Sequence, residues 1–400
     1  MSTSKVGAIW PPEWRTFNDP VSGVTITQLT SYKAHSHHPY FTEPGWYAGG
    51  RKLLFVSDRE NSRNLYGVDL ESGEITQLTD LDPAGGDLGK FSKSPAGEQA
   101  AFYYGDTLML LDLETLNLRP LYQRPAGYVR GSSNFTADGQ YICSYFVQDP
   151  TDKLAEIIGN DMTNYREYLE GRKTADSGKM QRLVWSTNPH SMIVKVATDG
   201  SGSEVAFEED YYMGHANCSP TLPNIMTYCH EGPWNLVDNR IWGLDLSTGK
   251  TWKIRPNGPG ESVGHEYWMV DGEHLGYHGR TPNGPIYGSI RYDNTDQTEA
   301  PFTYGSTHFH SRSLDLIVGD GSRRDPYLLL WRFQGGQFIG PKVLAFHRAS
   351  LQLGSLHVHP CFSPYGNQIS YTADPQGYGQ VFVVNVPDDF DALPDRDRIA

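Results

Sequence analysis

Two histidines near the C-terminal end of the chain have a spacing that suits metal binding. His357 and His359 stand two residues apart in the stretch HVHPCFSP. On an extended strand, side chains at this spacing point to the same face. A third imidazole from a neighbouring part of the fold, such as His308, would complete a divalent metal site with open positions for a ligand. The same pair could instead be hydrogen-bonded without a metal. Which of the two holds depends on the elements that carry the pair and on whether another histidine lies next to them.

The stretch HEGPWNLVDNRIW at 230–242 holds further groups of chemical interest. His230 and Glu231 could serve as general acid and base, or Glu231 could fix the loop that glycine and proline then turn. Arg240 lies among apolar strand residues, where a guanidinium is costly to bury without an anion. That anion could be a substrate, or it could be an internal carboxylate from Asp238 or Glu231.

A loose repeat runs through the whole chain and would position these residues. Each unit has a turn rich in Ser, Pro, Asp and Gly, an apolar strand, a second strand that ends in an aliphatic-Asp-Leu pattern, and a polar hairpin. Seven such units begin near residues 47, 94, 136, 218, 270, 311 and 363. Most of the spacings are 41 to 52 residues, which fits four-stranded antiparallel blades. The sequence therefore predicts an all-β, seven-bladed β-propeller that forms a single domain over 1–400.

One interval, from 136 to 218, is about twice as long as the others. It contains DPTDKLAEIIGNDMTNYREYLEGRK at 149–173, which has helical propensity and apolar positions at mixed spacings of three and four. We interpret this stretch as a helical insertion in the third blade that shapes one rim of the central channel. An eighth blade in the same interval is the alternative.

The two ends of the chain together would supply one complete blade. The last unit has only about three strands, whereas the N-terminal segment offers a spare one, GVTITQLT at 23–30. The sequence ITQLT occurs at 26–30 and again at 75–79, which supports equivalent outer positions. Adding the strand 23–30 to the last blade would close the ring and leave no open sheet edge.

The repeat also brings histidines together around one axis. Residues just before each turn should line the channel, because the turn follows the innermost strand of a blade. His359 lies seven residues before Gly366 of its turn, and His265 lies seven before Gly272. Four other histidines fall at comparable or somewhat larger offsets, namely His37, His38, His215 and His308. His265 could therefore be a base at the channel mouth, or a core histidine among its aromatic neighbours.

Composition excludes several classes of function. With 33 Lys and Arg against 47 Asp and Glu, the net charge is −14, and no basic stripe exists that could bind nucleic acid. An anionic substrate would have to be attracted locally, by a metal or by a few arginines in a cleft. No apolar run could span a membrane, and the N-terminal segment lacks the apolar core of a signal peptide. Together with four cysteines that lack metal-type spacing, these features predict a protein of the reducing cytoplasm.

At these residues the chain resembles the oligogalacturonate lyase family, seven-bladed propeller enzymes of pectin catabolism. The matching text is spread over most of the length, and its specific parts are HEGPWNLVDNRIW (230–242), GESVGHEYW (260–268) and HVHPCFSP (357–364). The blade strands themselves are generic to TolB-like propellers. The resemblance implies a carbon–oxygen lyase that cleaves short galacturonate oligomers, an acidic oligosaccharide substrate, by metal-assisted β-elimination.

The resemblance also implies a metal site. A manganese-type divalent ion (Mn²⁺) would be held by His308, His357 and His359, with His310 as the competitor of His308. The family's fourth ligand is a glutamine three residues before the first histidine of the pair. This chain has Gly354 at that position, so Gln352 is the candidate replacement.

Catalytic roles follow from the same resemblance. His265 would be the base that removes the proton α to the uronate carboxylate, and Arg240 would help to place the substrate anion. These residue types suit the reaction, since a neutral histidine can take up a proton while a metal and a cation stabilise the enolate-like transition state. Further substrate contacts would come from His37, Arg63, His215 and His230.

Two other functions stay open on the sequence alone. Gly354 in place of the glutamine, together with the insertion at 149–173, would suit a lyase of the same fold that acts on another uronate-containing glycan. A non-catalytic TolB-like propeller that binds a partner or a glycan is the other possibility. A scaffold, however, has no reason to collect imidazoles at one channel mouth.

Overall fold

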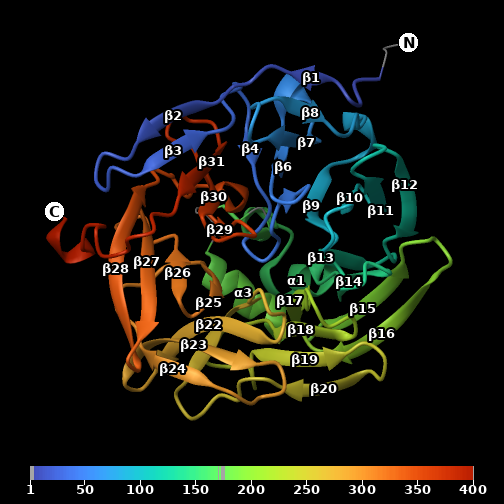
Figure 1. The fold of residues 1–400 in the computed structure, drawn as a ribbon. Coiled ribbons are helices and arrows are strands. Elements are labelled where there is room, and N and C mark those ends of the chain that lie inside the picture. The colour runs from blue at the N-terminus through green and yellow to red at the C-terminus, as the bar shows by residue number, and fades with distance from the viewer. Residues whose placement is uncertain (1–3, 170, 173–175, 400) are drawn as a thin grey trace.

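The computed structural model describes residues 4–169, 171–172 and 176–399. In this part of the chain, seven antiparallel sheets surround a central axis like the blades of a propeller (Figure 1). This arrangement confirms the predicted all-β, seven-bladed propeller. The predicted turn regions coincide with the hairpins between the two innermost strands of the blades. The alternative of an eighth blade is wrong, because the long interval from 136 to 218 holds the three outer strands of blade 3, helices, and the innermost strand of the next blade.

Five blades have four strands each, which follow chain order from the axis to the rim. Blade 2 consists of β9 (Leu88–Lys93), β10 (Gln99–Tyr104), β11 (Thr107–Asp112) and β12 (Leu118–Gln123); blade 3 of β13 (Tyr128–Phe135), β14 (Tyr141–Gln148), β15 (His190–Ala197) and β16 (Ser203–Asp210); blade 4 of β17 (Met213–Cys218), β18 (Ile225–His230), β19 (Ile241–Asp245) and β20 (Lys250–Lys253). Blade 5 consists of β21 (Ser262–Trp268), β22 (His274–Thr281), β23 (Gly284–Arg291) and β24 (Thr298–Pro301); blade 6 of β25 (Phe309–Ser313), β26 (Leu316–Gly319), β27 (Tyr327–Gln334) and β28 (Gln337–Phe346).

The other two blades hold the ends of the chain. Blade 1 consists of β4 (Ser36–His37), β5 (Trp46–Tyr47), β6 (Lys52–Ser57), β7 (Asn64–Asp69), β8 (Ile75–Gln77) and, at its outer edge, β1 (Ile9–Trp10). Blade 7 consists of β29 (Cys361–Phe362), β30 (Gln368–Ala373), β31 (Gln380–Asn385), β3 (Thr25–Gln28) and β2 (Arg15–Asn18). Because β3 pairs with β31, segments from both ends of the chain share this sheet.

Apolar side chains on both faces of the inner strands explain why the blades pack around the ring. In β6, every residue after Lys52 is buried, as expected for a strand with a neighbouring blade on either side. Leu328 and Leu330 of blade 6 share one apolar cluster with Ile369 and Val384 of blade 7. Each sheet therefore buries its faces against the next one, as in stacked sheets elsewhere.

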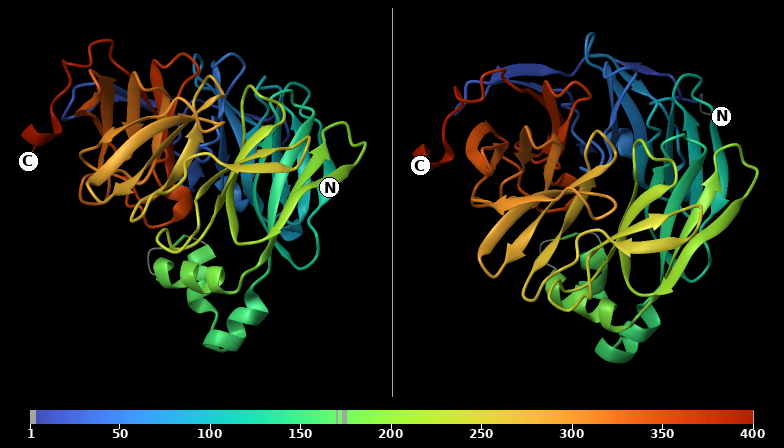
Figure 2. Two further views of the ribbon diagram at one scale, coloured as in Figure 1. Left: turned by 90° about the horizontal axis from the view of Figure 1, so that it is seen from below. Right: turned by 60° about the horizontal axis from the view of Figure 1, so that its bottom comes forward.

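Three helices interrupt blade 3 between β14 and β15, namely α1 (Thr151–Ile158), α2 (Thr163–Leu169) and α3 (Ser177–Ser186). They confirm the predicted helical insertion, although residues 170 and 173 of the predicted range lie outside the described residues. The insertion is longer than predicted, since α3 begins after 173; Asp176 caps this helix by accepting a hydrogen bond from the backbone N–H of Lys179. All three helices lie on one face of the propeller (Figure 2). No helix in the described ranges is long and apolar enough to cross a membrane.

A buried arginine fastens the N-terminal segment to blade 1. The side chain of Arg59 is fully buried, and its Nη1 donates a hydrogen bond to Glu13 Oε1 at 3.0 Å. Its guanidinium carbon lies 5.0 Å from the ring centroid of Trp10 and 5.2 Å from that of Tyr32. Since Trp10, Glu13 and Tyr32 all belong to the N-terminal segment, one cation holds that segment in place beside β1 to β3.

Replacing Arg59 by alanine should therefore destabilise the closed ring. We expect the free energy of unfolding to fall by about 3 kcal/mol, because the substitution leaves the Glu13 carboxylate without its partner. Arg51→Ala is the matched control, since Arg51 pairs with Asp69 of the same blade while 54% of its side chain is exposed. Its effect should stay below about 1 kcal/mol. Urea unfolding followed by tryptophan fluorescence measures both values, and equal effects would contradict the anchoring role.

Candidate active site

Two histidines reach the channel through the same distortion of an innermost strand. The register of β17 against β18 shifts between Gly214 and Asn217, and that of β21 against β22 shifts directly after Gly264. His215 and His265 occupy these bulges with φ of 47° and 52°, in the left-handed region. A β-bulge re-aims the side chain that it carries. Both imidazoles accordingly line one cavity at the channel mouth.

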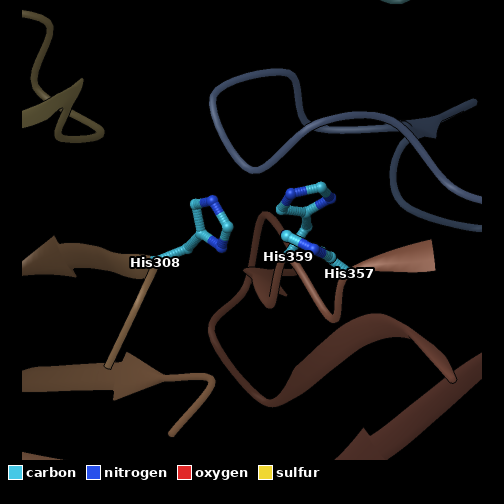
Figure 3. Close-up of side chains that lie close together, drawn as sticks. All are labelled: His308, His357 and His359. Carbon is cyan, nitrogen blue, oxygen red and sulfur yellow. The ribbon is translucent and has the colours of Figure 1, made fainter. Parts of the chain in front are cut away.

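Three further imidazoles lie together where blades 6 and 7 meet. One ring nitrogen from each of His308, His357 and His359 falls within 4.8 Å of the others, and His308 faces the pair across a gap (Figure 3). His308 directly precedes β25, whereas the pair lies in the loop between a 3₁₀ turn (Gly354–Leu356) and β29. The predicted strand position of the pair is therefore wrong. A left-handed residue, His359 with φ of 45°, and not strand alternation, places the two rings near each other.

Asp320 fixes the ring of His308. Its Oδ2 accepts a hydrogen bond from His308 Nδ1 at 2.7 Å, while its Oδ1 accepts from the backbone N–H groups of Thr307 and His308 at 2.8 and 2.9 Å. Since a carboxylate can only accept, Nδ1 carries a proton, and in the neutral ring Nε2 then keeps its lone pair. Metal-binding histidines are commonly held in this way by a carboxylate on the other ring nitrogen.

The surroundings of His359 also suit a metal ligand. Burial, followed by the charges of His308 and His357, lowers the pKa of His359 well below its usual range, so this ring is neutral at pH 7. His38 supports the loop: its Nε2 lies 2.7 Å from the carbonyl oxygen of His359, and its Nδ1 lies 2.7 Å from Thr372 Oγ1. Imidazole groups that converge in this way are a donor set that divalent transition metals prefer.

His265 stands next to this trio. Its ring is stacked on that of His308 with the centroids 5.6 Å apart, and the ring of Trp234 lies 5.5 Å away. Its Nδ1 is 3.0 Å from Nε2 of His278. Burial, followed by His278 and His308, lowers the pKa of His265 well below its usual range. The imidazole is therefore neutral at pH 7 and can accept a proton, and its place on a cavity wall argues against a purely core role.

Arg240 is paired inside the protein. Its Nη1 and Nη2 donate to Oε1 and Oε2 of Glu231 at 3.0 and 3.2 Å, so Glu231 and not Asp238 is its partner. Burial alone would raise the pKa of Glu231, but Arg240 and His215 together lower it to about 2. Gln181 of α3 donates to the same carboxylate at 2.6 Å. Glu231 thus stays ionised and links the insertion to the channel wall, which is the structural role considered for it.

Two cavities flank the histidines, and the helical insertion borders both. One has a volume of about 380 Å³ and is lined, among others, by Arg130, His215, Trp234, Arg240 and His265. The other has a volume of about 420 Å³ and is lined, among others, by His37, Tyr40, Lys90, His308, His357 and His359. Tyr168 and Leu169 of α2 contribute to both linings, as the position of the helices on this face suggests (Figure 2).

Two predicted site residues lie away from the cluster. Gln352 is exposed and lines neither cavity, so the structure does not bring it to the three histidines. At Gly354 the insertion approaches closely instead, because a Cβ added to Gly171 would lie only 3.1 Å from the Gly354 Cα. Arg63 donates to Asp58 at 2.6 and 3.1 Å and to Asp87 at 3.1 Å, beside a separate surface pocket.

His230 and His310 also lie outside the cluster. Nδ1 of His230 is 2.6 Å from Asp238 and its Nε2 is 3.0 Å from Glu209, so carboxylates occupy both nitrogens of this buried ring. The predicted substrate contact by His230 is therefore replaced by a structural role. His310 is buried against a tyrosine ring and borders a different pocket, so His308 is the third member of the trio.

Sequence reasoning missed two cations of the cavity walls. Lys90 of β9 lines the cavity that holds the trio, and Arg130 of β13 lines the other. Lys90 lies seven residues before Gly97, the same offset at which His265 and His359 precede their turn glycines. The repeat could therefore have indicated Lys90, whereas no comparable signal distinguishes Arg130.

Removal of the carboxylate behind His308 should weaken metal binding. For Asp320→Ala we expect affinity for Mn²⁺ to fall about 10- to 100-fold, because the ring of His308 would lose its orientation and its fixed tautomer. Asp315→Ala, at an exposed position of the same blade, is the control and should leave affinity unchanged. Titration calorimetry gives both constants, and circular dichroism verifies that the variants fold. Undiminished affinity in a folded Asp320→Ala protein would contradict the role of this carboxylate.

Comparison with known proteins places this chain in a family. A family model described as oligogalacturonate lyase matches residues 5–390. An oligogalacturonide lyase of Pectobacterium atrosepticum is 27% identical, with 94% of this chain and 97% of the relative aligned. An oligogalacturonate lyase of Dickeya dadantii is 26% identical, with 94% and 96% aligned.

Solved structures give the same picture of the fold. A structure of oligogalacturonate lyase in complex with manganese superimposes with a TM-score of 0.81 at 24% identity, covering 96% of this chain and 98% of that one. An oligogalacturonate lyase of Vibrio parahaemolyticus also gives 0.81, at 22% identity, covering 96% and 100%. Since the family model spans nearly the whole sequence, the chain belongs to the oligogalacturonate lyase family.

Proposed function

We propose that this protein is a carbon–oxygen lyase that cleaves short galacturonate oligomers derived from pectin by β-elimination. The observation that carries the proposal is the position of His265. It is a neutral imidazole on a cavity wall, stacked at 5.6 Å on one member of a metal-type histidine trio. Lyases of this substrate class are also the relatives that align over almost the full length of the chain.

His308, His357 and His359 would hold the divalent ion. Their nitrogens converge within 4.8 Å, and Asp320 orients the first ring, which fits a three-histidine site with open positions for a ligand. We propose Mn²⁺, because a similar structure is described in complex with manganese. When bound, the ion would withdraw electron density from the uronate carboxylate and so lower the pKa of the neighbouring proton. Exposed Gln352 is not part of the proposed set.

His265 is the proposed base. It takes the proton from C5, the carbon α to the carboxylate, and the electron pair of that C–H bond forms the C4–C5 double bond. The bond from C4 to the glycosidic oxygen breaks, and the leaving oxygen takes a proton from water. Arg240 lines the same cavity. Its positive charge can therefore help to stabilise the negative charge that develops on the substrate.

One lysine and one arginine side chain are proposed to bind the uronate carboxylates. Lys90 and Arg130 line the two cavities, and neither has a carboxylate at ion-pair distance within the described residues. Because the chain carries a net charge of −14, attraction of an acidic sugar has to come from such local cations. His37 and His215, which were predicted as substrate contacts, also line these cavities and complete the proposed binding surface.

The proposed compartment is the cytoplasm. All four cysteines are free in the structure, and three of them are buried. Stable free thiols suit a reducing environment.

Loss of the base should affect turnover more than binding. For His265→Ala we expect kcat to fall about 10²- to 10⁴-fold, since that is the usual contribution of a general base. His190→Ala is the control, because His190 of β15 lines neither cavity. Ultraviolet absorbance of the double bond conjugated with the carboxylate follows the reaction on di- and trigalacturonate. An unchanged kcat in His265→Ala would refute the assignment of the base.

Metal removal provides a separate test of the same proposal. Treatment with a chelator should abolish the lyase activity, and Mn²⁺ should restore it. A panel of glucuronate oligomers, assayed in parallel, tests which uronic acid the protein cleaves. Activity on these oligomers alone would indicate that the substrate is another uronate-containing glycan. Activity that survives both chelation and His265→Ala would overturn the mechanism, and no activity on any uronide would overturn the proposal that the protein is a lyase.

A further inference from the structure

A second buried imidazole stands directly behind the proposed base. His278 lies in β22, next to β21, and is paired in register with Gly264, the residue before His265. The bulge after Gly264 brings Nδ1 of His265 to 3.0 Å from Nε2 of His278. At this distance one of the two nitrogens carries a hydrogen and the other accepts it. The direction of this hydrogen bond decides which nitrogen of His265 is left for chemistry.

The geometry points to one direction once His265 acts as the base. Nδ1 of His265 faces Nε2 of His278, so only Nε2 of His265 is left for the substrate. A base needs a free lone pair, and a neutral imidazole has only one N–H. The proton of His265 therefore lies on Nδ1, which donates to Nε2 of His278.

The environment of His278 keeps the ring neutral, as this arrangement requires. Its ring centroid lies 4.9 Å from that of Phe309 and 6.3 Å from that of Trp234. Burial in this aromatic wall, followed by the charge of His308, lowers the pKa of His278 to about 4. No carboxylate in the described part of the chain forms an ion pair with His278 that could hold it protonated. The two rings thus form one hydrogen-bonded pair in which His265 is the donor and His278 the acceptor.

We propose that His278 is a positioning residue that holds His265 in its Nδ1–H tautomer and aims its unprotonated Nε2 at the substrate. The inference rests on the proposed function, in which His265 is the base. Once Nε2 takes up the substrate proton, the Nδ1–H···Nε2 bond becomes a charge-assisted hydrogen bond, which stabilises the imidazolium. The same logic operates in catalytic triads, where the group behind a histidine sets its tautomer.

Two substitutions of His278 separate this role from simple packing. His278→Leu removes the acceptor, and we expect kcat to fall about 10- to 100-fold with KM changed less than about 2-fold. His278→Gln retains an acceptor for the Nδ1–H of His265, its side-chain oxygen, so kcat should stay within about 3-fold of the wild-type value. His274→Leu is the control on the same strand, since His274 is held by Asp271 and Asp296 at the surface. It should leave both constants unchanged.

The tautomer itself can be observed without turnover. Long-range ¹H–¹⁵N spectra of the ¹⁵N-histidine-labelled full chain, loaded with diamagnetic Zn²⁺, distinguish Nδ1–H from Nε2–H in His265. We expect Nδ1–H in the wild type and in His278→Gln, and a mixture of tautomers in His278→Leu. An Nε2–H tautomer in the wild type, or equal kcat losses for the two His278 variants, would overturn the inference. If the wild type cleaves no uronide at all, the proposed function fails, and the spectra still report on the His265–His278 bond.

Discussion

Closure of the ring is the constraint on which the site depends. A strand from the N-terminal segment, β3, pairs with β31 near the other end of the chain, so blade 7 is completed by residues more than three hundred positions away. Only in a closed ring do the innermost strands of blades 4 to 7 meet at one axis, which brings His215, His265, His308 and the His357–His359 loop into one region. The buried Arg59–Glu13 pair holds the N-terminal segment against blade 1 and thereby supports this geometry.

Within that ring, the chemistry depends on which group contacts Nδ1 of each imidazole. Asp320 accepts from Nδ1 of His308, and His278 lies against Nδ1 of His265, so in each case Nε2 is directed to the site. The two supports differ in charge. The Asp320 carboxylate orients the ring that belongs to the metal-type trio, whereas a neutral imidazole fixes a tautomer and adds little charge. Stacked rings 5.6 Å apart can thus serve different purposes.

The fold was predictable because the same pattern of turn and strand residues recurs in the sequence of each blade. Turns recur at blade spacing, and the offset of seven residues that places His265 and His359 also places Lys90. What the sequence could not supply is the direction and the partners of single side chains. His230 has carboxylates on both nitrogens and Arg63 is paired with two aspartates, yet nothing in their spacing distinguishes these structural roles from substrate contacts. The loop before β29 is a similar case, since a left-handed backbone at His359 replaces the expected strand.

The helical insertion forms the remaining part of the site, since residues of α2 line both cavities. Gly171 approaches the backbone of Gly354 so closely that a Cβ would need to displace it, and its φ of 64° also favours glycine. The insertion can therefore lie against the loop that carries His357, while Gln181 of α3 donates a hydrogen bond to Glu231 beside the other cavity. Because the insertion lines both cavities, it partly excludes water and lowers the local dielectric constant. A lower dielectric constant strengthens the attraction between a uronate carboxylate and the cations Lys90 and Arg130. An acidic protein can attract an acidic sugar for this reason: the −14 net charge is spread over a solvated surface where ions screen it, whereas Lys90 and Arg130 act in a confined space.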